Sequence, residues 1–219
     1  ANAAHQLRTP LAGLRTQTEL ALRQFESEGD REELHRSLRQ IVLSTERAVR
    51  MVNQLLSLSR AERAGEAAAP PQLRVVELDR LVRERVLDWV DAALKKRIDL
   101  GCDEARAVPV VIEGDPVLLG ELAGNLIDNA IRYTPPGGTI NVHVRAAPAD
   151  APMVGGVLEV EDSGPGIPPA ERELVFERFY RVLGSDPEGR NVEGSGLGLA
   201  IVREIVARHH AHIAIGESS

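Results

Sequence analysis

A histidine near the start of the chain and two glycine-rich segments far along it have the residue types that phosphoryl transfer requires. His5 stands in the segment HQLRTPL, residues 5–11, and the glycines stand in DSGPGI, residues 162–167, and GSGLGL, residues 194–199. A neutral imidazole nitrogen has a lone pair that can attack phosphorus. Backbone N–H groups at the start of a helix bind anions. The combination predicts phosphoryl transfer between two parts of one chain, although the position of His5 alone is more typical of an exposed surface histidine.

The glycine segments could bind phosphate, but they match neither the Rossmann fingerprint nor the P-loop. No strand runs directly into residues 194–199, as a Rossmann fingerprint needs, and no Lys-Ser or Lys-Thr pair follows, as a P-loop needs. By itself this segment also suits a surface loop. Asp162 follows an expected strand and could accept a hydrogen bond from a ligand amino group, although Asp, Ser, Gly and Pro are equally typical of a plain turn.

Two asparagines in the middle of an expected helix form a candidate metal site. Asn125 and Asn129 are four residues apart and therefore share a helix face, with Arg132 and Tyr133 one turn on. Carboxamide oxygens suit Mg²⁺, which prefers hard oxygen ligands. Arg132 could meet a phosphate group. The alternative is that both amides bond only to local backbone groups.

The elements that must position these residues fall into two patterns. Residues 1–63 have a helical period, interrupted by a polar turn in which Gly29 stops one helix and Asp30 caps the next. The two heptad seams comprise Leu7, Leu11, Leu14, Thr18, Ala21 and Phe25, then Leu34, Leu38, Ile41, Thr45, Ala48, Val52, Leu55 and Ser59. Because a lone hairpin covers only one stripe, we expect a dimeric four-helix bundle. His5 lies off this seam, and Pro10 is expected to kink the helix beside it.

Residues 65–72, rich in Ala and Pro, are expected to form a linker, and a mixed α/β pattern follows. The expected strands are 73–78, 97–102, 108–113, 139–146 and 156–161. The expected helices are 79–96 with Asp79 as its cap, 115–133, a short one from Pro168-Pro169, and 197–209.

Composition excludes some classes of protein. The 219 residues are 43% hydrophobic but only 3% aromatic, and their net charge of −7 argues against non-specific binding to nucleic acid or anionic membrane. Cys102 is the single cysteine, which excludes an internal disulfide and suits a buried thiol.

We do not expect His209, His210 and His212 to form a metal site, because carboxylate and Cys partners are missing. The chain is expected to be a fragment, since it opens inside a helix.

Five motifs in a fixed order resemble those of two-component sensor histidine kinases. The segment 5–11 resembles their H-box, residues 125–134 (NLIDNAIRYT) their N-box, and residues 162–167 their G1 box. Residues 176–181 (FERFYR) resemble the F-box, and residues 194–199 the G2 box. The resemblance covers almost the whole chain.

The resemblance implies an α+β fold: a phosphotransfer hairpin (1–64), a linker (65–72) and a Bergerat-type α/β sandwich that binds ATP (73–219). It implies that His5 accepts the γ-phosphoryl group, that Asn129 and Asn125 hold Mg²⁺, and that Asp162 reads the adenine amino group. Residues 167–193 would form an ATP lid anchored by Phe176 and Phe179. Further nucleotide contacts would come from Arg132, Tyr133, Gly164, Gly166, Ile167, Gly194, Ser195, Gly196, Leu197, Gly198 and Leu199.

The implied partners are a second copy of the chain and a response regulator, within the cytoplasmic portion of a bacterial inner-membrane protein. Thr9 matches the family position that orients water when the regulator is dephosphorylated. One residue departs from the family pattern: Gln6 replaces the usual Glu or Asp after the histidine, and an amide cannot take up a proton at neutral pH. We expect autophosphorylation to persist, with the proton leaving to water or phosphate.

Two other classes of protein share part of this pattern. Hydrolytic ATPases and clamps of the Bergerat fold place Glu where this chain has Asn125, and they lack an H-box hairpin. A non-catalytic module that senses nucleotide or dimerises would not need the complete motif set.

Overall fold

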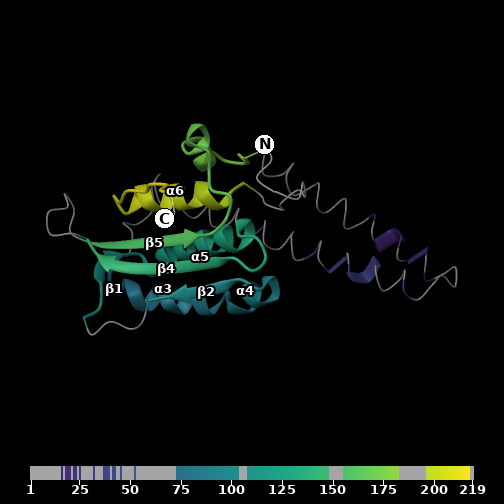
Figure 1. Cartoon of the computed structure of the whole chain (residues 1–219), viewed down its shortest axis with the longest axis horizontal. Coiled ribbons are helices and arrows are strands. Elements are labelled where there is room, and N and C mark those ends of the chain that lie inside the picture. The colour runs from purple at the N-terminus through teal and green to yellow at the C-terminus, as the bar shows by residue number, and fades with distance from the viewer. Residues whose placement is uncertain are drawn as a thin grey trace. The chain divides into compact units, whose positions relative to one another are not determined.

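The computed structural model describes residues 73–103, 108–147, 155–182 and 196–217, together with single positions between residues 16 and 52 (Figure 1). The chain divides into two compact units, residues 1–57 and 58–219, and each is described by itself.

The described residues of the first unit are all helical. They are residues 16, 18–20, 22, 23, 25, 32, 37–39, 41, 42, 45 and 52. Three apolar residues of the expected heptad seams are exposed on the single chain: Phe25 is 71% exposed, Leu38 47% and Val52 39%. Exposed apolar side chains at seam spacing need a partner surface to remove them from water. His5, Gln6, Thr9, the expected kink at Pro10 and the turn at Gly29 lie outside the described residues.

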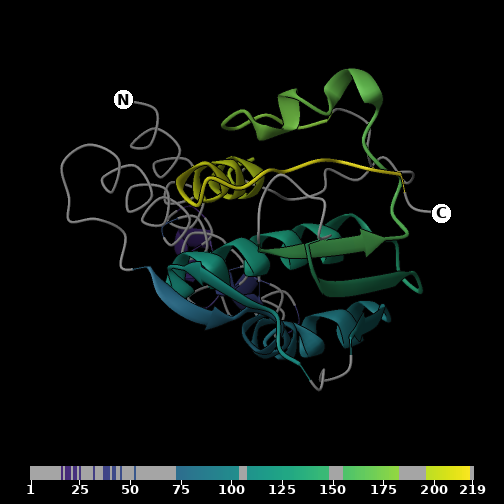
Figure 2. The ribbon, with the colours of Figure 1, turned by 90° about the vertical axis from the view of Figure 1, so that its left-hand side faces the viewer.

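The second unit is a two-layer α/β sandwich. Its elements are β1 (Arg74–Glu77), α3 (Leu78–Leu87), α4 (Val90–Lys96), β2 (Asp99–Cys102), β3 (Val111–Gly114), α5 (Pro116–Tyr133), β4 (Thr139–Ala146), β5 (Gly156–Asp162), the 3-10 turns η1 (Pro169–Glu171) and η2 (Leu174–Phe176), and α6 (Gly198–Arg208). A three-stranded sheet has the order β2-β4-β5, with β2 parallel and β5 antiparallel to β4. Strands β1 and β3 pair separately and antiparallel. Figure 2 shows the residues after α6 crossing that helix and then running away from it toward the C-terminus.

The core lies between the sheet and the helices, and the burial of the β4 side chains alternates from Thr139 to Arg145. Ile140, Val142 and Val144 are buried, whereas Thr139 and Asn141, which point to the opposite face, are exposed. These three side chains join one apolar cluster with residues of α3 and α5, such as Val82, Val86, Ala123 and Ile127. The helices that carry the candidate site are thereby fixed on one face of the sheet.

The prediction of one continuous helix over residues 79–96 was wrong, because two helices, α3 and α4, occupy this stretch. At the break, Asp88 N–H donates to the Arg85 carbonyl (3.2 Å) and Trp89 N–H to the Val86 carbonyl (3.0 Å). These are tight three-residue turns, which end an α-helix. The left-handed Arg97 (φ 58°) then ends α4, so that β2 begins two residues later than the expected strand.

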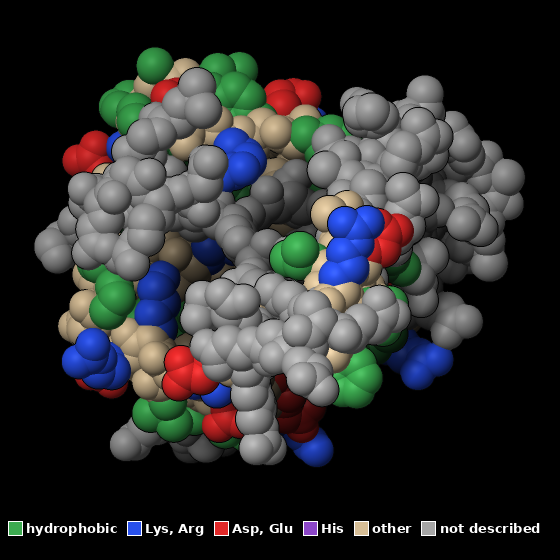
Figure 3. Space-filling model, turned by 90° about the vertical axis from the view of Figure 1, so that its right-hand side faces the viewer, with side chains coloured by type: hydrophobic (Ala, Val, Ile, Leu, Met, Phe, Trp, Pro, Cys, Tyr) green, Lys and Arg blue, Asp and Glu red, His purple; other side chains and the backbone are tan. Residues whose placement is uncertain are grey.

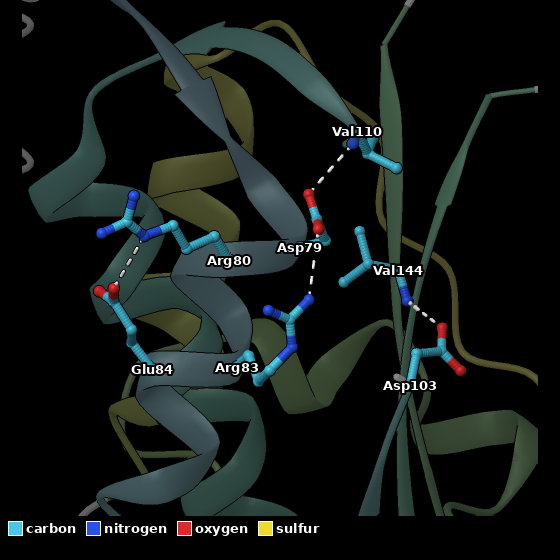
Figure 4. A network of polar contacts seen from close by, with 7 residues as sticks. All are labelled: Asp79, Arg80, Arg83, Glu84, Asp103, Val110 and Val144. Carbon is cyan, nitrogen blue, oxygen red and sulfur yellow. Dashed lines mark hydrogen bonds and ion pairs between the residues drawn. The ribbon is translucent and has the colours of Figure 1, made fainter. Parts of the chain in front are cut away.

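Asp79 was also assigned the wrong role, because it lies in the first turn of α3 and does not cap it. Its Oδ1 accepts from the Val110 N–H (3.0 Å) and its Oδ2 pairs with Arg83 Nη2 (3.3 Å), as Figure 4 shows. The carboxylate thus ties the start of α3 to the chain just before β3. In the same view, Asp103 Oδ2 accepts from the Val144 N–H (3.0 Å) and secures the end of β2 to β4.

Charged side chains of the described residues are interspersed on the face drawn in Figure 3, with hydrophobic side chains between them. Several of the surface pairs lie within one helix, such as Arg80–Glu84 and Arg85–Asp88 on and just after α3. Exposed pairs of this kind each contribute about 0–1 kcal/mol to stability. The charges therefore add little to what the core supplies.

Candidate functional site

Helix α5 presents a polar face toward the candidate site and an apolar face toward the core. Asp115 caps its start by accepting from the N–H groups of Val117 (2.9 Å) and Leu118 (3.3 Å), and Pro116 occupies the first turn. The candidate residues Asn125, Asn129, Arg132 and Tyr133 are all partly buried.

The asparagine pair lies directly beside the first residue of α6. A β-carbon at Gly198 would lie 3.3 Å from Asn125 Oδ1 and 3.4 Å from both Nδ2 and Oδ1 of Asn129. Asn125 Nδ2 donates to the Glu121 carbonyl (2.9 Å), so the local bond considered as an alternative is present for this residue. That bond orients the amide with its oxygen toward Gly198. Residues 73 positions apart in sequence therefore meet at one point.

The start of α6 is suited to an anion. No side chain among the described residues caps it, and four residues anchor the helix in the core: Ala200, Ile201, Val202 and Ile205. Backbone N–H groups in the first turn of an uncapped helix, together with the helix dipole, favour negative charge. A phosphate group here would lie beside the Asn125 and Asn129 amides.

Asp162 is the last residue of β5, and the turn that follows it lies against the end of α5. Its Oδ1 accepts from the Gly164 N–H (2.8 Å). A β-carbon at Gly164 would lie 2.6 Å from that oxygen and 3.1 Å from the Tyr133 carbonyl oxygen, so a larger residue here would displace the Asp162 carboxylate and press on the end of α5. Asp162 Oδ2 receives no hydrogen bond from the residues that the structure describes, which leaves it available to a ligand amino group.

Further along, Gly166 is left-handed (φ 70°), and the Ile167 carbonyl accepts from Arg172 Nε (3.2 Å). Arg172 in turn pairs with Glu217 (2.8 Å), which joins this loop to the segment after α6.

The F-box residues are joined to the start of α6. Phe179 N–H donates to the Gly196 carbonyl (2.8 Å), and both residues have a left-handed backbone, with φ of 66° and 67°. Phe176 is buried, and Glu177 pairs with Arg203 of α6 (2.8 Å). The hydrogen bond from the Arg203 guanidinium, followed by its charge, lowers the pKa of the Glu177 carboxyl. Two segments that flank residues 183–195 are thereby held together.

The structure describes most of the residues expected in the site. Leu197 is fully buried and Leu199 partly buried, next to Gly196 and Gly198. Gly194 and Ser195 lie outside the described residues, as do His5, Gln6 and Thr9.

Sequence reasoning missed three polar residues that support the site. Asp128 Oδ2 pairs with Arg132 Nη2 (2.7 Å), and Lys96 Nζ donates to the carbonyls of Ile131 and Arg132 (2.7 Å each). The spacing of four residues could have revealed the Asp128–Arg132 pair. Nothing in the local sequence points to Lys96, because its partners are 35 and 36 residues away.

His209, the third missed residue, links α6 to α5 rather than standing free at a helix end. Its Nε2 accepts from the Asp115 N–H (3.0 Å), and its Nδ1 donates to the Ile205 carbonyl (2.8 Å). Because both ring nitrogens are engaged, the neutral tautomer with hydrogen on Nδ1 is the one that satisfies both bonds.

Thr134 ends α5 with a buried hydroxyl. The residue is 0% exposed, and its Oγ1 has no hydrogen-bond partner among the described residues. We expect Thr134→Val, which keeps the shape and removes the hydroxyl, to leave the free energy of unfolding unchanged or raise it by about 1 kcal/mol. Urea denaturation measures this. Thr134→Ser, which instead removes a buried methyl group, should cost about 1 kcal/mol. A destabilised Val variant beside a neutral Ser variant would show that the hydroxyl has a partner.

Comparison with known proteins places this geometry in a family. Residues 1–64 match the His Kinase A (phospho-acceptor) domain, and residues 114–219 match the histidine kinase-, DNA gyrase B-, and HSP90-like ATPase domain. The chain is 36% identical to sensor protein QseC of Salmonella typhi over 218 residues, which is 100% of this chain and 44% of the relative.

Another relative is the signal transduction histidine-protein kinase/phosphatase MprB of Mycolicibacterium vanbaalenii, 36% identical over 220 residues (99% of this chain, 42% of the relative). Among solved structures, histidine kinase ThkA in complex with response regulator protein TrrA resembles the fold with a TM-score of 0.67 and 22% identity, covering 96% of this chain and 54% of that chain. The chain thus spans less than half the length of these two curated relatives.

The chain belongs to the sensor histidine kinases and contains their phospho-acceptor domain followed by their ATP-binding domain. Its two domains give it an α+β fold, as the motifs predicted. Among the described residues, no helix has the length and apolar character to cross a membrane.

Proposed function

We propose that the chain phosphorylates itself on His5 with ATP and then passes the phosphoryl group to an aspartate of a response regulator. In the first step a ring nitrogen of His5 forms a bond to the γ-phosphorus, while the bond from that phosphorus to the bridging oxygen of ADP breaks. The ring proton leaves to water or phosphate, because Gln6 cannot accept it. ADP is the leaving group, so atoms and charge balance.

The observation that carries this proposal is the approach of Gly198 to Asn125 and Asn129. It brings two amides and an uncapped helix start to one point, which suits a nucleotide triphosphate. On this proposal the G2-box glycines would cradle the phosphates, Arg132 and Tyr133 would contact the nucleotide, and Asp162 Oδ2 would accept from the adenine amino group.

Mg²⁺ fits the residues at this point. Carboxamide oxygens are hard ligands, and the absence of a side chain at Gly198 leaves room beside both amides. Asn129 and Asn125 would hold the ion, which would neutralise charge on the phosphates when bound.

The domain boundaries proposed are 1–64 for the phosphotransfer hairpin, 65–72 for the linker and 73–219 for the catalytic domain. We propose a homodimer, because exposed apolar side chains such as Phe25, Leu38 and Val52 recur at seam spacing on the single chain. We further propose that the chain is the cytoplasmic part of a bacterial inner-membrane sensor.

The response regulator as partner is supported by the solved complex of the related ThkA with TrrA. A phosphatase activity toward that regulator is supported by the name of the relative MprB, a kinase/phosphatase. Thr9, four residues after His5, would orient the attacking water in that reaction.

The proposed function is tested by incubating the chain with Mg²⁺ and γ-labelled ATP. Label should appear on the protein and be lost in acid but kept in base, as expected for a phosphorus–nitrogen bond. Peptide mapping should place it within residues 1–64. Label that survives acid would indicate a phosphoester on a hydroxyl side chain, and label that appears only as free phosphate would favour an ATPase. Either result would contradict the proposal.

Gln6→Glu should raise the rate of autophosphorylation by about tenfold, because a carboxylate beside the ring can accept its proton, and positioned general bases contribute about 10²–10⁴-fold. The measurement is the initial rate of labelling at saturating ATP, between pH 6 and 9. Gln17→Glu, which adds the same charge farther along the first expected helix, is the control and should leave the rate unchanged. Equal rates for wild type and Gln6→Glu would mean that proton removal does not limit the reaction.

A further inference from the structure

The last turn of α5 ends beside the residues assigned to the nucleotide. Thr134 N–H donates to the Ala130 carbonyl (2.9 Å) and closes the final turn. The next carbonyls, those of Ile131 and Arg132, lie beyond the reach of any helical N–H, because a helix leaves its last carbonyls without partners. Both accept from Lys96 Nζ at 2.7 Å. One ammonium group thus satisfies two orphan acceptors.

Lys96 is held in place by the way in which α4 ends. Arg97 adopts the left-handed conformation, and its N–H and that of Ile98 bond back to the carbonyls of Leu94 (2.9 Å) and Ala93 (2.9 Å). Ile98 and Ala93 are buried in the core. The backbone around Lys96 is therefore anchored on both sides, and the partly buried side chain reaches across to α5.

The interaction is electrostatically favourable as well as geometrically close. The carbonyl end of a helix has partial negative charge, and a cation there is stabilising. Hydrogen bonds from a charged donor are roughly twice as strong as neutral ones. The contact lies close to the candidate nucleotide residues, because Lys96 binds the backbone carbonyl of Arg132 and that of Ile131 before it.

We propose that Lys96 is a positioning residue for nucleotide binding: it fixes the last turn of α5 so that Arg132 and Tyr133 face the bound nucleotide. The inference rests on the proposed function of this site. The Tyr133 carbonyl oxygen lies 3.1 Å from where a β-carbon of Gly164 would stand, so the same turn also supports the loop after Asp162. Without Lys96, two carbonyls lose their donor and the turn that carries both nucleotide contacts frays.

The test uses the full chain and the non-hydrolysable analogue AMPPNP with Mg²⁺, titrated by calorimetry well below the melting temperature of every variant. Lys96→Met should raise the Kd by about tenfold, the size expected from the loss of charge-assisted hydrogen bonds. Lys96→Arg, which keeps a cationic donor, should restore the Kd to within about threefold of wild type. Lys95→Met, the same change at the exposed neighbour, is the matched control and should bind as wild type does.

A second readout separates positioning from mere stability. Amide hydrogen exchange at residues 131–134 should quicken in Lys96→Met, while the amides of β4 keep their protection. If Lys96→Met melts at a lower temperature but binds AMPPNP as tightly as wild type, Lys96 is structural only and the proposal is overturned.

If Lys96→Met does not fold, Lys96→Gln, which keeps an N–H donor without the charge, takes its place with an expected rise in Kd of at least about threefold. Wild-type affinity in that variant would equally overturn the proposal. If wild type itself does not bind AMPPNP, the proposed function has failed, and the role of Lys96 fails with it.

Discussion

His5→Ala is expected to abolish acid-labile labelling of the chain by γ-labelled ATP. Alanine has no lone pair to attack phosphorus, and the reaction has no other nucleophile at that position. The loss should be complete, to below about one part in 10³ of the wild-type rate, because removal of a covalent nucleophile leaves only background transfer. Quantitative gel labelling over a time course measures this.

Two controls make the His5 result specific. His35→Ala removes another histidine of the same expected hairpin and should leave labelling unchanged. His5→Ala should also keep the wild-type Kd for AMPPNP, since the residues assigned to the nucleotide belong to the other compact unit. Persistent acid-labile label in His5→Ala would mean that another histidine accepts the phosphoryl group, and the assignment of residues 5–11 would be abandoned.

Gly196→Ala should weaken AMPPNP binding by more than about tenfold and slow labelling at least as much. A β-carbon there would lie 2.7 Å from Phe179 Cα and 2.7 Å from its carbonyl carbon, and these are backbone atoms that cannot rotate away. The position is also left-handed, with φ of 67°, which adds about 1–2 kcal/mol of strain for a residue with a β-carbon. Relief requires Phe179 and Gly196 to separate, which breaks their hydrogen bond and displaces the start of α6.

Two control variants separate the backbone strain at Gly196 from the clash of its β-carbon with Phe179. Gly137 is also left-handed, with φ of 85°, but a β-carbon there would meet nothing within 4 Å. Gly137→Ala should therefore lower the free energy of unfolding by about 1 kcal/mol and leave the Kd for AMPPNP unchanged. Gly155 is not left-handed, and a β-carbon there would meet nothing within 4 Å. Gly155→Ala should therefore change neither the free energy of unfolding nor the Kd. A Gly196→Ala variant with wild-type affinity would show that the junction with Phe179 does not support the site.

Local patterns predicted much of the second unit because their physical causes are local. Strand β4 spans Thr139–Ala146, the range expected from its alternation, since side chains in a strand alternate between two faces. Helix α5 begins after Asp115, as expected from an N-cap followed by Pro116. The strand expected at 108–113 begins instead at Val111, because Val110 is occupied by bonds to Asp79 and Leu78.

The motifs themselves, and with them the family and the candidate residues, were readable in the sequence alone because they are matters of residue type and order. Only the tertiary structure decided what lies beside what. Gly198 meets the Asn125 and Asn129 amides, Lys96 meets the end of α5, and His209 reaches the Asp115 N–H. Each contact joins residues at least 35 positions apart, and such contacts depend on how helices pack on a sheet, which no local pattern encodes. Periodicity assigns a residue to a face, whereas packing of the core determines which partner that face meets.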